Sequence, residues 1–127
     1  MLMKDLYYLN QIRPKIVNSK MSIKTTYKFS RLFKEVEEQA NFFDTTLSNI
    51  IAQYGQRDEK GEYVLTEDKN GVMIQEDKKD ECLAKINELN NLEINFNYIP
   101  AFNLDELEFL DLTVDEMTIL MPFIEEE

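Results

Sequence analysis

The sequence predicts a mainly α-helical fold with a small β-hairpin, an α+β arrangement in a single domain over residues 1–127. Three observations lead to this prediction. Apolar residues recur at helical spacing throughout residues 21–54, and again over a shorter range, 77–90. Between these two ranges, Asn70-Gly71 separates two short runs of strand-forming residues, which is a strong hairpin signal.

The long helix is expected over about residues 21–54. Ser19 or Ser22 can cap its start, and Gly55 stands where a helix-terminating glycine belongs. Its apolar seam has the alternating steps of three and four residues used by coiled coils, so another part of the chain, or a second copy, has to cover it. The seam consists of Phe29, Phe33, Val36, Ala40, Phe43, Leu47, Ile50 and Tyr54.

The helical part is expected to span residues 4–54, because a short helix over 4–12 precedes the long one. Pro14 is then either the first-turn proline of a new segment or the stop of the short helix. A polar break at residues 18–20 leads into the long helix. We therefore expect a short helix hinged onto the main one.

The β-hairpin is expected at residues 62–75, with apolar runs at 63–65 and 72–74. The second helix follows at 77–90, where Ile86 and Leu89 lie on one face with Cys82 or Leu83. This order returns the second helix antiparallel to the second half of the long helix.

The C-terminal part, residues 92–127, is acidic and mixed in structure. Strict alternation over 92–96 predicts a strand or an extended edge. A turn of helix is expected from about residue 103 to 110, and a further helix begins at Thr113. Thr113 and Glu116 form a capping box, and apolar residues follow on one face until Pro122.

Charge is strongly polarised along the chain, whose net charge is −11. Residues 1–34 hold eight lysines and arginines against one acid, whereas residues 86–127 hold eleven acids and no basic residue. The acidic part either folds back onto the basic helix face or serves as a docking surface that steers a partner. A basic stripe at Lys20, Lys24, Lys28 and Arg31 is either a nucleic-acid face or a solvated helix surface that faces the acidic tail. The acidic chain would be repelled from phosphate, which argues against direct nucleic-acid binding.

The residue content gives no sign of an enzyme. There is no histidine, and the three glycines all lie in turns rather than in a phosphate-binding loop. Residues 66–77 resemble a calcium loop in spacing, but Thr66 and Asp77 are poor substitutes for its first and last ligands. Catalytic, cofactor-binding and metal residues are therefore predicted to be absent, and no cofactor is expected.

The cellular setting is predicted to be the cytoplasm. The chain has no apolar run long enough to cross a membrane, and its start lacks the pattern of a signal peptide. The single cysteine, Cys82, fits a reducing compartment.

Four stretches resemble a family of short uncharacterised proteins of tailed phages and prophages of low-GC Gram-positive bacteria. They are residues 24–37 (KTTYKFSRLFKEVE), 50–61 (IIAQYGQRDEKG), 82–89 (CLAKINEL) and 120–126 (LMPFIEE). The resemblance spans nearly the whole chain and implies a phage origin, with the host cytoplasm or the virion as location. It carries over no functional residue.

The function predicted from these observations is that of a non-enzymatic phage or prophage accessory protein. It would act by protein–protein binding, for example in tail or virion assembly, and its partner could be a second copy of the chain. The alternative is an acidic inhibitor that mimics nucleic acid and blocks a host nucleic-acid-binding or defence enzyme. The candidate contact residues are Phe29, Phe33 and Val36 on the seam, and Asp105, Glu106, Glu108, Asp111, Asp115 and Glu116 in the acidic part.

Overall fold

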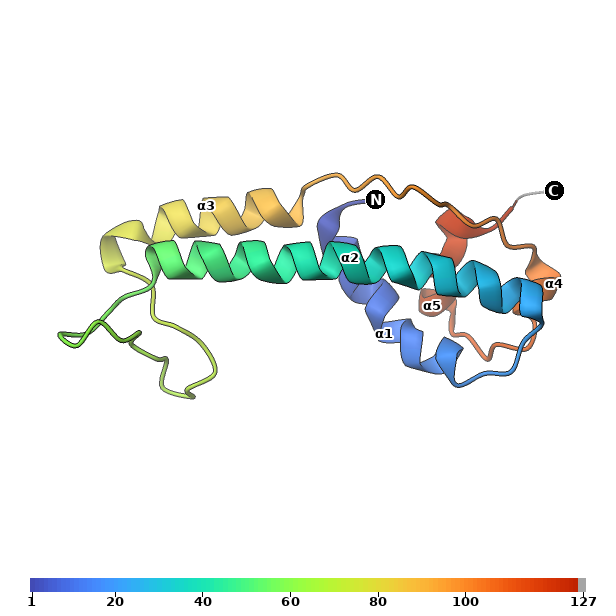
Figure 1. The fold of residues 1–127 in the computed structure, drawn as a ribbon, viewed down its shortest axis with the longest axis horizontal. Coiled ribbons are helices and arrows are strands. Elements are labelled where there is room, and N and C mark those ends of the chain that lie inside the picture. Colours follow the sequence, from blue (N-terminus) through green and yellow to red (C-terminus); the bar gives the residue numbers. More distant parts are fainter. Residues whose placement is uncertain (126–127) are drawn as a thin grey trace. The chain divides into compact units, whose positions relative to one another are not determined.

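The computed structural model describes residues 1–125, and this part of the chain is mainly helical (Figure 1). By its internal contacts the chain divides into two compact units. Unit 1 is Met1–Ala40 together with the chain from Glu93 onward, and unit 2 is Asn41–Leu92. The elements in order are η1 (Met3–Asp5), α1 (Leu6–Val17), α2 (Ile23–Tyr54), η2 (Glu76–Lys78), α3 (Lys79–Asn90), α4 (Leu104–Leu107), α5 (Val114–Leu120) and η3 (Met121–Phe123).

Unit 1 is built on α1 and the first part of α2. Helix α1 buries one stripe, Leu6, Leu9, Ile12 and Ile16, at the spacing of a helix face. It is longer than predicted, because Pro14 lies inside it rather than at a boundary. The missing N–H of Pro14 leaves the carbonyl of residue 10 without its helical partner, and residue 10 is exposed, so water can satisfy that carbonyl.

The C-terminal chain completes the core of unit 1. Phe102 is fully buried, and its ring stacks on Phe29 with centroids 4.3 Å apart. A parallel β-bridge joins Phe102 to Ile124, which fixes the path of the chain after η3. Helix α5 packs against α1, and its Leu120 is fully buried. The predicted capping box at the start of α5 is confirmed, since Thr113 accepts a hydrogen bond from the Glu116 backbone N–H.

Unit 2 is a pair of helices closed by a loop. The second part of α2 and the returning helix α3 share a small core of Ile50, Tyr54, Cys82 and Leu89. Phe43, Leu47, Ile74 and Ile86 pack partly buried against that core. The second half of the predicted seam is therefore covered by α3, with help from the loop, as the spacing of apolar residues in both ranges indicated.

The predicted β-hairpin at residues 62–75 is wrong. No β-strand is present between residues 1 and 125, and the segment contains only isolated bridges, such as Leu65 to Val72. The reason is that backbone pairing is divided among three short segments. The Val64 N–H donates to the Gln56 carbonyl, the Gln56 N–H to the Met73 carbonyl, and the Met73 N–H to the Val64 carbonyl. No two of the three segments therefore form a continuous ladder of hydrogen bonds.

The turn between these segments also differs from the prediction, which centred it on Asn70-Gly71. Lys69 is the residue with positive φ, 62°, and its N–H bonds to the carbonyl of Thr66. The hydroxyl of Thr66 and the N–H of Asn70 both donate to the carboxylate of Asp68. These side-chain bonds hold the turn, so the preference of Asn-Gly for a two-residue hairpin loop is overridden.

Of the two alternatives for residues 92–96, a strand or an extended edge, the strand is wrong. This segment is extended, but it forms a single bridge, between Glu93 and Leu2, and one further bond from Ile94 N–H to the Met1 carbonyl. The pairing stops there because η1 begins at Met3 and its backbone turns away into helix. Ile94 is nevertheless buried, which explains the alternation in the sequence.

Across residues 1–125, no helix is both long enough and apolar enough to span a bilayer.

Candidate functional site

The seam residues predicted to contact a partner are buried inside unit 1. Phe29, Phe33 and Val36 are exposed by 3%, 4% and 0% respectively. Phe29 stacks on Phe33 as well as on Phe102, so these side chains pack on one another and on the C-terminal chain. They belong to the core, and a contact surface has to be sought elsewhere.

The acidic residues predicted as a contact surface fall into two groups. Glu106 and Glu116 are partly buried and form ion pairs with lysines of unit 1. The other four are exposed and form no ion pair within residues 1–125: Asp105, Glu108, Asp111 and Asp115. The C-terminal part thus neutralises the basic face at two points and leaves four carboxylates on the surface.

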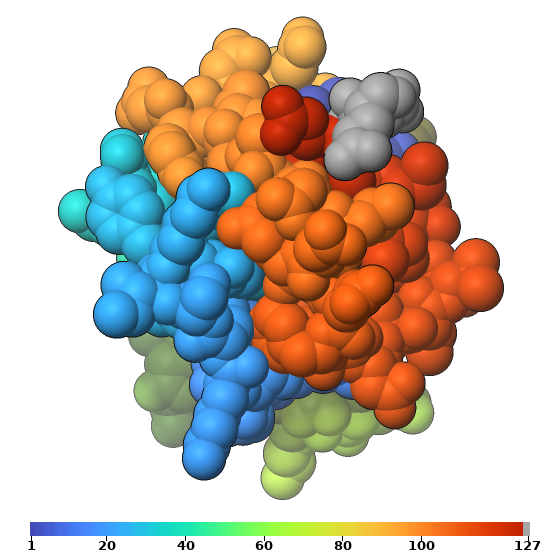
Figure 2. Space-filling model, turned by 90° about the vertical axis from the view of Figure 1, so that its right-hand side faces the viewer, coloured from blue at the N-terminus to red at the C-terminus, as the bar shows by residue number. Residues whose placement is uncertain are grey.

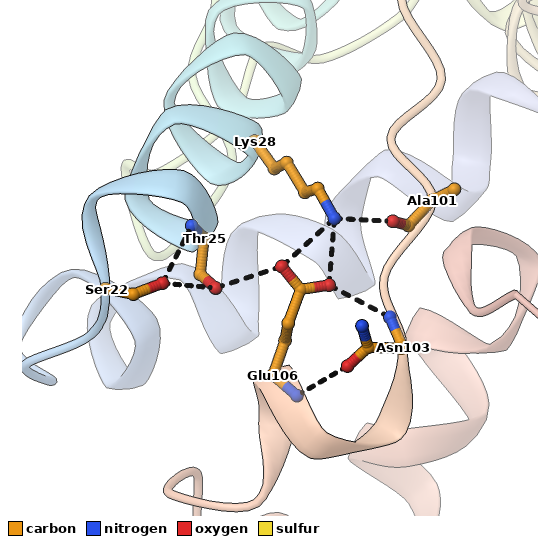
Figure 3. A network of polar contacts seen from close by, with 6 residues as sticks. All are labelled: Ser22, Thr25, Lys28, Ala101, Asn103 and Glu106. Atoms are coloured by element: carbon orange, nitrogen blue, oxygen red, sulfur yellow. Dashed lines mark hydrogen bonds and ion pairs between the residues drawn. The ribbon is translucent and has the colours of Figure 1, made fainter.

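Glu106 is the centre of a polar network that joins α4 to the start of α2 (Figure 3). Its carboxylate accepts bonds from Lys28 Nζ at 2.8 and 3.0 Å and from the Thr25 hydroxyl at 3.1 Å. The same carboxylate caps α4 by accepting from Asn103 N–H at 3.0 Å. Lys28 Nζ also donates to the Ala101 carbonyl at 2.7 Å. One ammonium group therefore bonds both to Glu106 in α4 and to the chain just before α4.

The environment of Glu106 keeps its side chain ionised. Burial alone would raise its pKa, but the bonds from Lys28, the Asn103 N–H and Thr25 together outweigh burial and lower the pKa below its ordinary value. Thr25 is itself buried, at 2% exposure, and is held by the Ser22 hydroxyl. A carboxylate with a lowered pKa and three fixed partners is poorly suited to exchanging protons, so its role is structural.

Glu116 performs the same two tasks at α5. It accepts from Lys15 Nζ at 2.7 Å and, as part of the capping box, from the Thr113 N–H at 2.9 Å. The hydrogen bond from Lys15 is the main cause of a lowered pKa at Glu116. Lys15 also donates to the carbonyl of Asp111 at 2.7 Å. Both ion pairs therefore connect helix capping to tertiary packing.

The basic stripe is largely used in packing. Lys28 holds Glu106, and the guanidinium of Arg31 lies 4.2 Å from the ring centroid of Tyr98 and 5.9 Å from that of Tyr27. Lys20 and Lys24 remain exposed. One turn after Arg31, Glu35 accepts bonds from the backbone N–H groups of residues 97 and 98. The first part of α2 thus anchors the extended chain that leads to α4.

Three large apolar side chains are exposed at the start of α2, at the start of α4 and just after α4, and the sequence prediction did not identify them. Ile23 is 90% exposed, Leu104 60% and Phe109 42%; these three residues are called the end patch. Of these three residues, Phe109 lines a groove of about 390 Å³, together with Ser22, Thr25, Asn103, Asp105 and Glu106. Figure 2 shows this face, with the start of α2 in light blue beside the orange C-terminal chain.

A sequence signal for the end patch exists in retrospect. Ile23 and Leu104 are the first residues of α2 and α4, where no preceding turn packs against their side chains. Apolar residues at a first helical turn, flanked by polar capping residues, are typical of surface positions. The periodic apolar pattern that predicts a buried face does not include them.

No group of three or more metal-binding side chains is found within residues 1–125. In the segment resembling a calcium loop, Asp68 has a lowered pKa, chiefly because the Thr66 hydroxyl donates to it, with the Asn70 N–H as the next cause. The Asp68 carboxylate therefore already has hydrogen-bond partners within its own turn.

Comparison of the chain with protein families, with curated proteins and with solved structures found no match.

Proposed function

We propose that this protein is a non-enzymatic accessory protein that acts by binding another protein through the end patch. The observation that carries the proposal is the exposure of Ile23 and Leu104. They are the first residues of α2 and α4, the two helices that the polar network around Glu106 joins (Figure 3). Large apolar side chains that are left exposed beside polar groups are typical of protein contact sites.

Rigidity supports this assignment. The Lys28–Glu106 ion pair is 2.8 Å long, and its side chains are only 15% and 12% exposed. The network that includes it holds the start of α2 and the whole of α4 in one arrangement before any partner arrives. A preorganised contact face loses less conformational entropy on binding than a mobile one, so more of the apolar contact energy appears as affinity.

The proposed setting is the assembly of a phage tail or virion in the cytoplasm of a bacterial host. It rests on the resemblance of the four sequence stretches named above to phage and prophage proteins. In such an assembly the partner is a structural protein, and a second copy of this chain is one form of that partner.

Site-specific photo-crosslinking tests the proposal. A photoreactive phenylalanine is placed at Leu104 or, as a control, at Leu83, which lies in unit 2 and has nearly the same exposure, 58% against 60%. After irradiation in cells that produce the protein, position 104 should give one discrete adduct, identified by mass spectrometry, and position 83 should not. Equal, diffuse labelling at both positions would contradict a dedicated contact at the end patch.

A second candidate function, the nucleic-acid mimic, is favoured by the four exposed acids Asp105, Glu108, Asp111 and Asp115. Binding through these carboxylates would weaken steeply as salt rises, because exposed charges are screened. Binding through the end patch would change little between low and high salt. A captured partner whose affinity falls strongly with salt would therefore favour the mimic.

A further inference from the structure

A second groove in unit 1 lies between α1 and the first part of α2, and it shares no lining residue with the groove at Phe109. Its volume is about 400 Å³, within the range of small-molecule sites. The floor is apolar and tightly packed, with Ile16, Phe29 and Phe33 exposed by only 1%, 3% and 4%. The proposed protein contact does not use this groove.

Two cationic side chains from different helices line the groove. Arg13 comes from α1 and Lys34 from α2. Lys34 forms no ion pair within residues 1–125. The guanidinium of Arg13 lies over the ring of Phe33, 5.4 Å from its centroid, so charge and apolar floor meet at one place.

One carboxylate, Glu37, also lines the groove, and it faces Arg13 at 3.9 Å. The two side chains of this pair are 39% and 61% exposed, and such pairs contribute little free energy. An incoming anion could therefore replace Glu37 at Arg13 with little loss. Thr26 and Ser30, one helical turn apart on α2, add hydroxyl groups to the lining.

The geometry points to a binding site for a small organic anion with an apolar body, such as an aromatic or aliphatic carboxylate, sulfonate or phosphate. The acidic group pairs with Arg13 and Lys34, and the apolar body covers Phe29 and Phe33. Charge complementarity selects this class: two cationic side chains and one carboxylate line the groove, so an anion has two charged partners there and a cation has only Glu37.

A matched pair of fluorescent probes tests this assignment. 8-Anilinonaphthalene-1-sulfonate carries the anionic group, and N-phenyl-1-naphthylamine has the same aromatic body without it. The sulfonate should bind the intact protein about fivefold or more tighter than the neutral probe, the factor expected for one partly exposed ion pair. Equal binding of the two probes would overturn the assignment of an anion site.

Substitutions then locate the site. Lys34→Gln should weaken the sulfonate probe about fivefold and leave the neutral probe unchanged, whereas Lys24→Gln, an exposed lysine outside the groove, should change neither. Ser30→Trp should fill the groove and weaken both probes. Retained sulfonate binding in Ser30→Trp, with the thermal unfolding of the variant unchanged, would place the probe elsewhere and also overturn the proposal.

Discussion

The two compact units are stabilised in different ways. Unit 1 closes across long sequence separations: Phe102 packs on Phe29, and Glu106 pairs with Lys28. Unit 2 is local, since its helices and loop all lie within residues 41–92, and its core has four buried apolar side chains within that range. One continuous helix, α2, contributes to both. The same periodic pattern therefore supports a tertiary core in one half and a helix pair in the other.

The strongest test of this contrast truncates one core side chain in each unit. Phe102→Ala should destabilise unit 1 by about 3–5 kcal/mol, because a fully buried aromatic ring is lost from between Phe29 and its neighbours. Ile50→Ala should destabilise unit 2 by about 2–4 kcal/mol. Amide hydrogen exchange by NMR should show lost protection mainly in the unit that carries the change. Equal loss in both units from either variant would mean that they unfold as one.

The second test concerns the polar closure of unit 1 and its pH dependence. Glu106→Gln should cost about 2–3 kcal/mol near neutral pH, because Lys28 loses its charged partner at a site shielded from water. Since folding lowers the pKa of Glu106 below 4.5, its contribution is complete above that pH and is lost as pH falls through the lower folded value.

Denaturant unfolding at a series of pH values measures this effect. The intact protein should lose stability as pH falls below about 4.5, and Glu106→Gln should lose less over the same interval. Some acid sensitivity should remain in the variant, because the pKa of Glu116 is also lowered. Parallel pH curves for the two proteins would show that Glu106 is not coupled to folding.

The third test addresses the loop of unit 2. A Cβ added at Gly55 would lie 2.7 Å from the Ile51 carbonyl oxygen and 2.9 Å from the Tyr63 ring. Gly55→Ala should therefore destabilise unit 2 by roughly 1–3 kcal/mol. Gly71→Ala is the matched control, since its nearest neighbour, Thr66, would be at an ordinary 3.5 Å. A comparable drop in melting temperature for both variants would refute this steric account.

The smallest expected effect sharpens the contrast between the ion pairs of the two units. Lys79 pairs with Glu76 at 2.8 Å, the same distance as Lys28 with Glu106, but its side chains are 53% and 88% exposed. Glu76→Gln should change the free energy of unfolding by less than about 0.5 kcal/mol. A cost approaching that of Glu106→Gln would mean that burial does not decide the strength of these pairs.

The helices could be predicted from the sequence because a helix needs only its own periodic pattern and its ends. The predicted range 21–54 contains all of α2, Ile23–Tyr54, and Gly55 directly follows it. The β-hairpin could not be judged in this way. Residues 63–65 form a strand only if one neighbouring segment supplies a continuous row of backbone hydrogen bonds. Here the Val64 N–H bonds to Gln56 while the Val64 carbonyl bonds to Met73, so the pairing is divided between two segments.

The candidate site was harder to predict than the helices. The sequence shows that Phe29, Phe33 and Val36 need a cover, but it does not show that the C-terminal chain supplies one. The same limit applies to the acids, since Glu106 and Glu108 look alike in sequence and only the first meets a lysine. The end patch escaped prediction because it joins residues that are far apart in the chain.

The closure of unit 1 by its last residues has a consequence for synthesis on the ribosome. All of residues 41–92 emerge before Phe102, so unit 2 can fold while the partner surface of Phe29 is still being translated. Synthesis proceeds at about 5–20 residues per second, so the apolar face of the first half of α2 stays uncovered for seconds before Phe102 is made. During that interval the nascent chain exposes an aggregation-prone helix, and chaperone binding is expected to concentrate there.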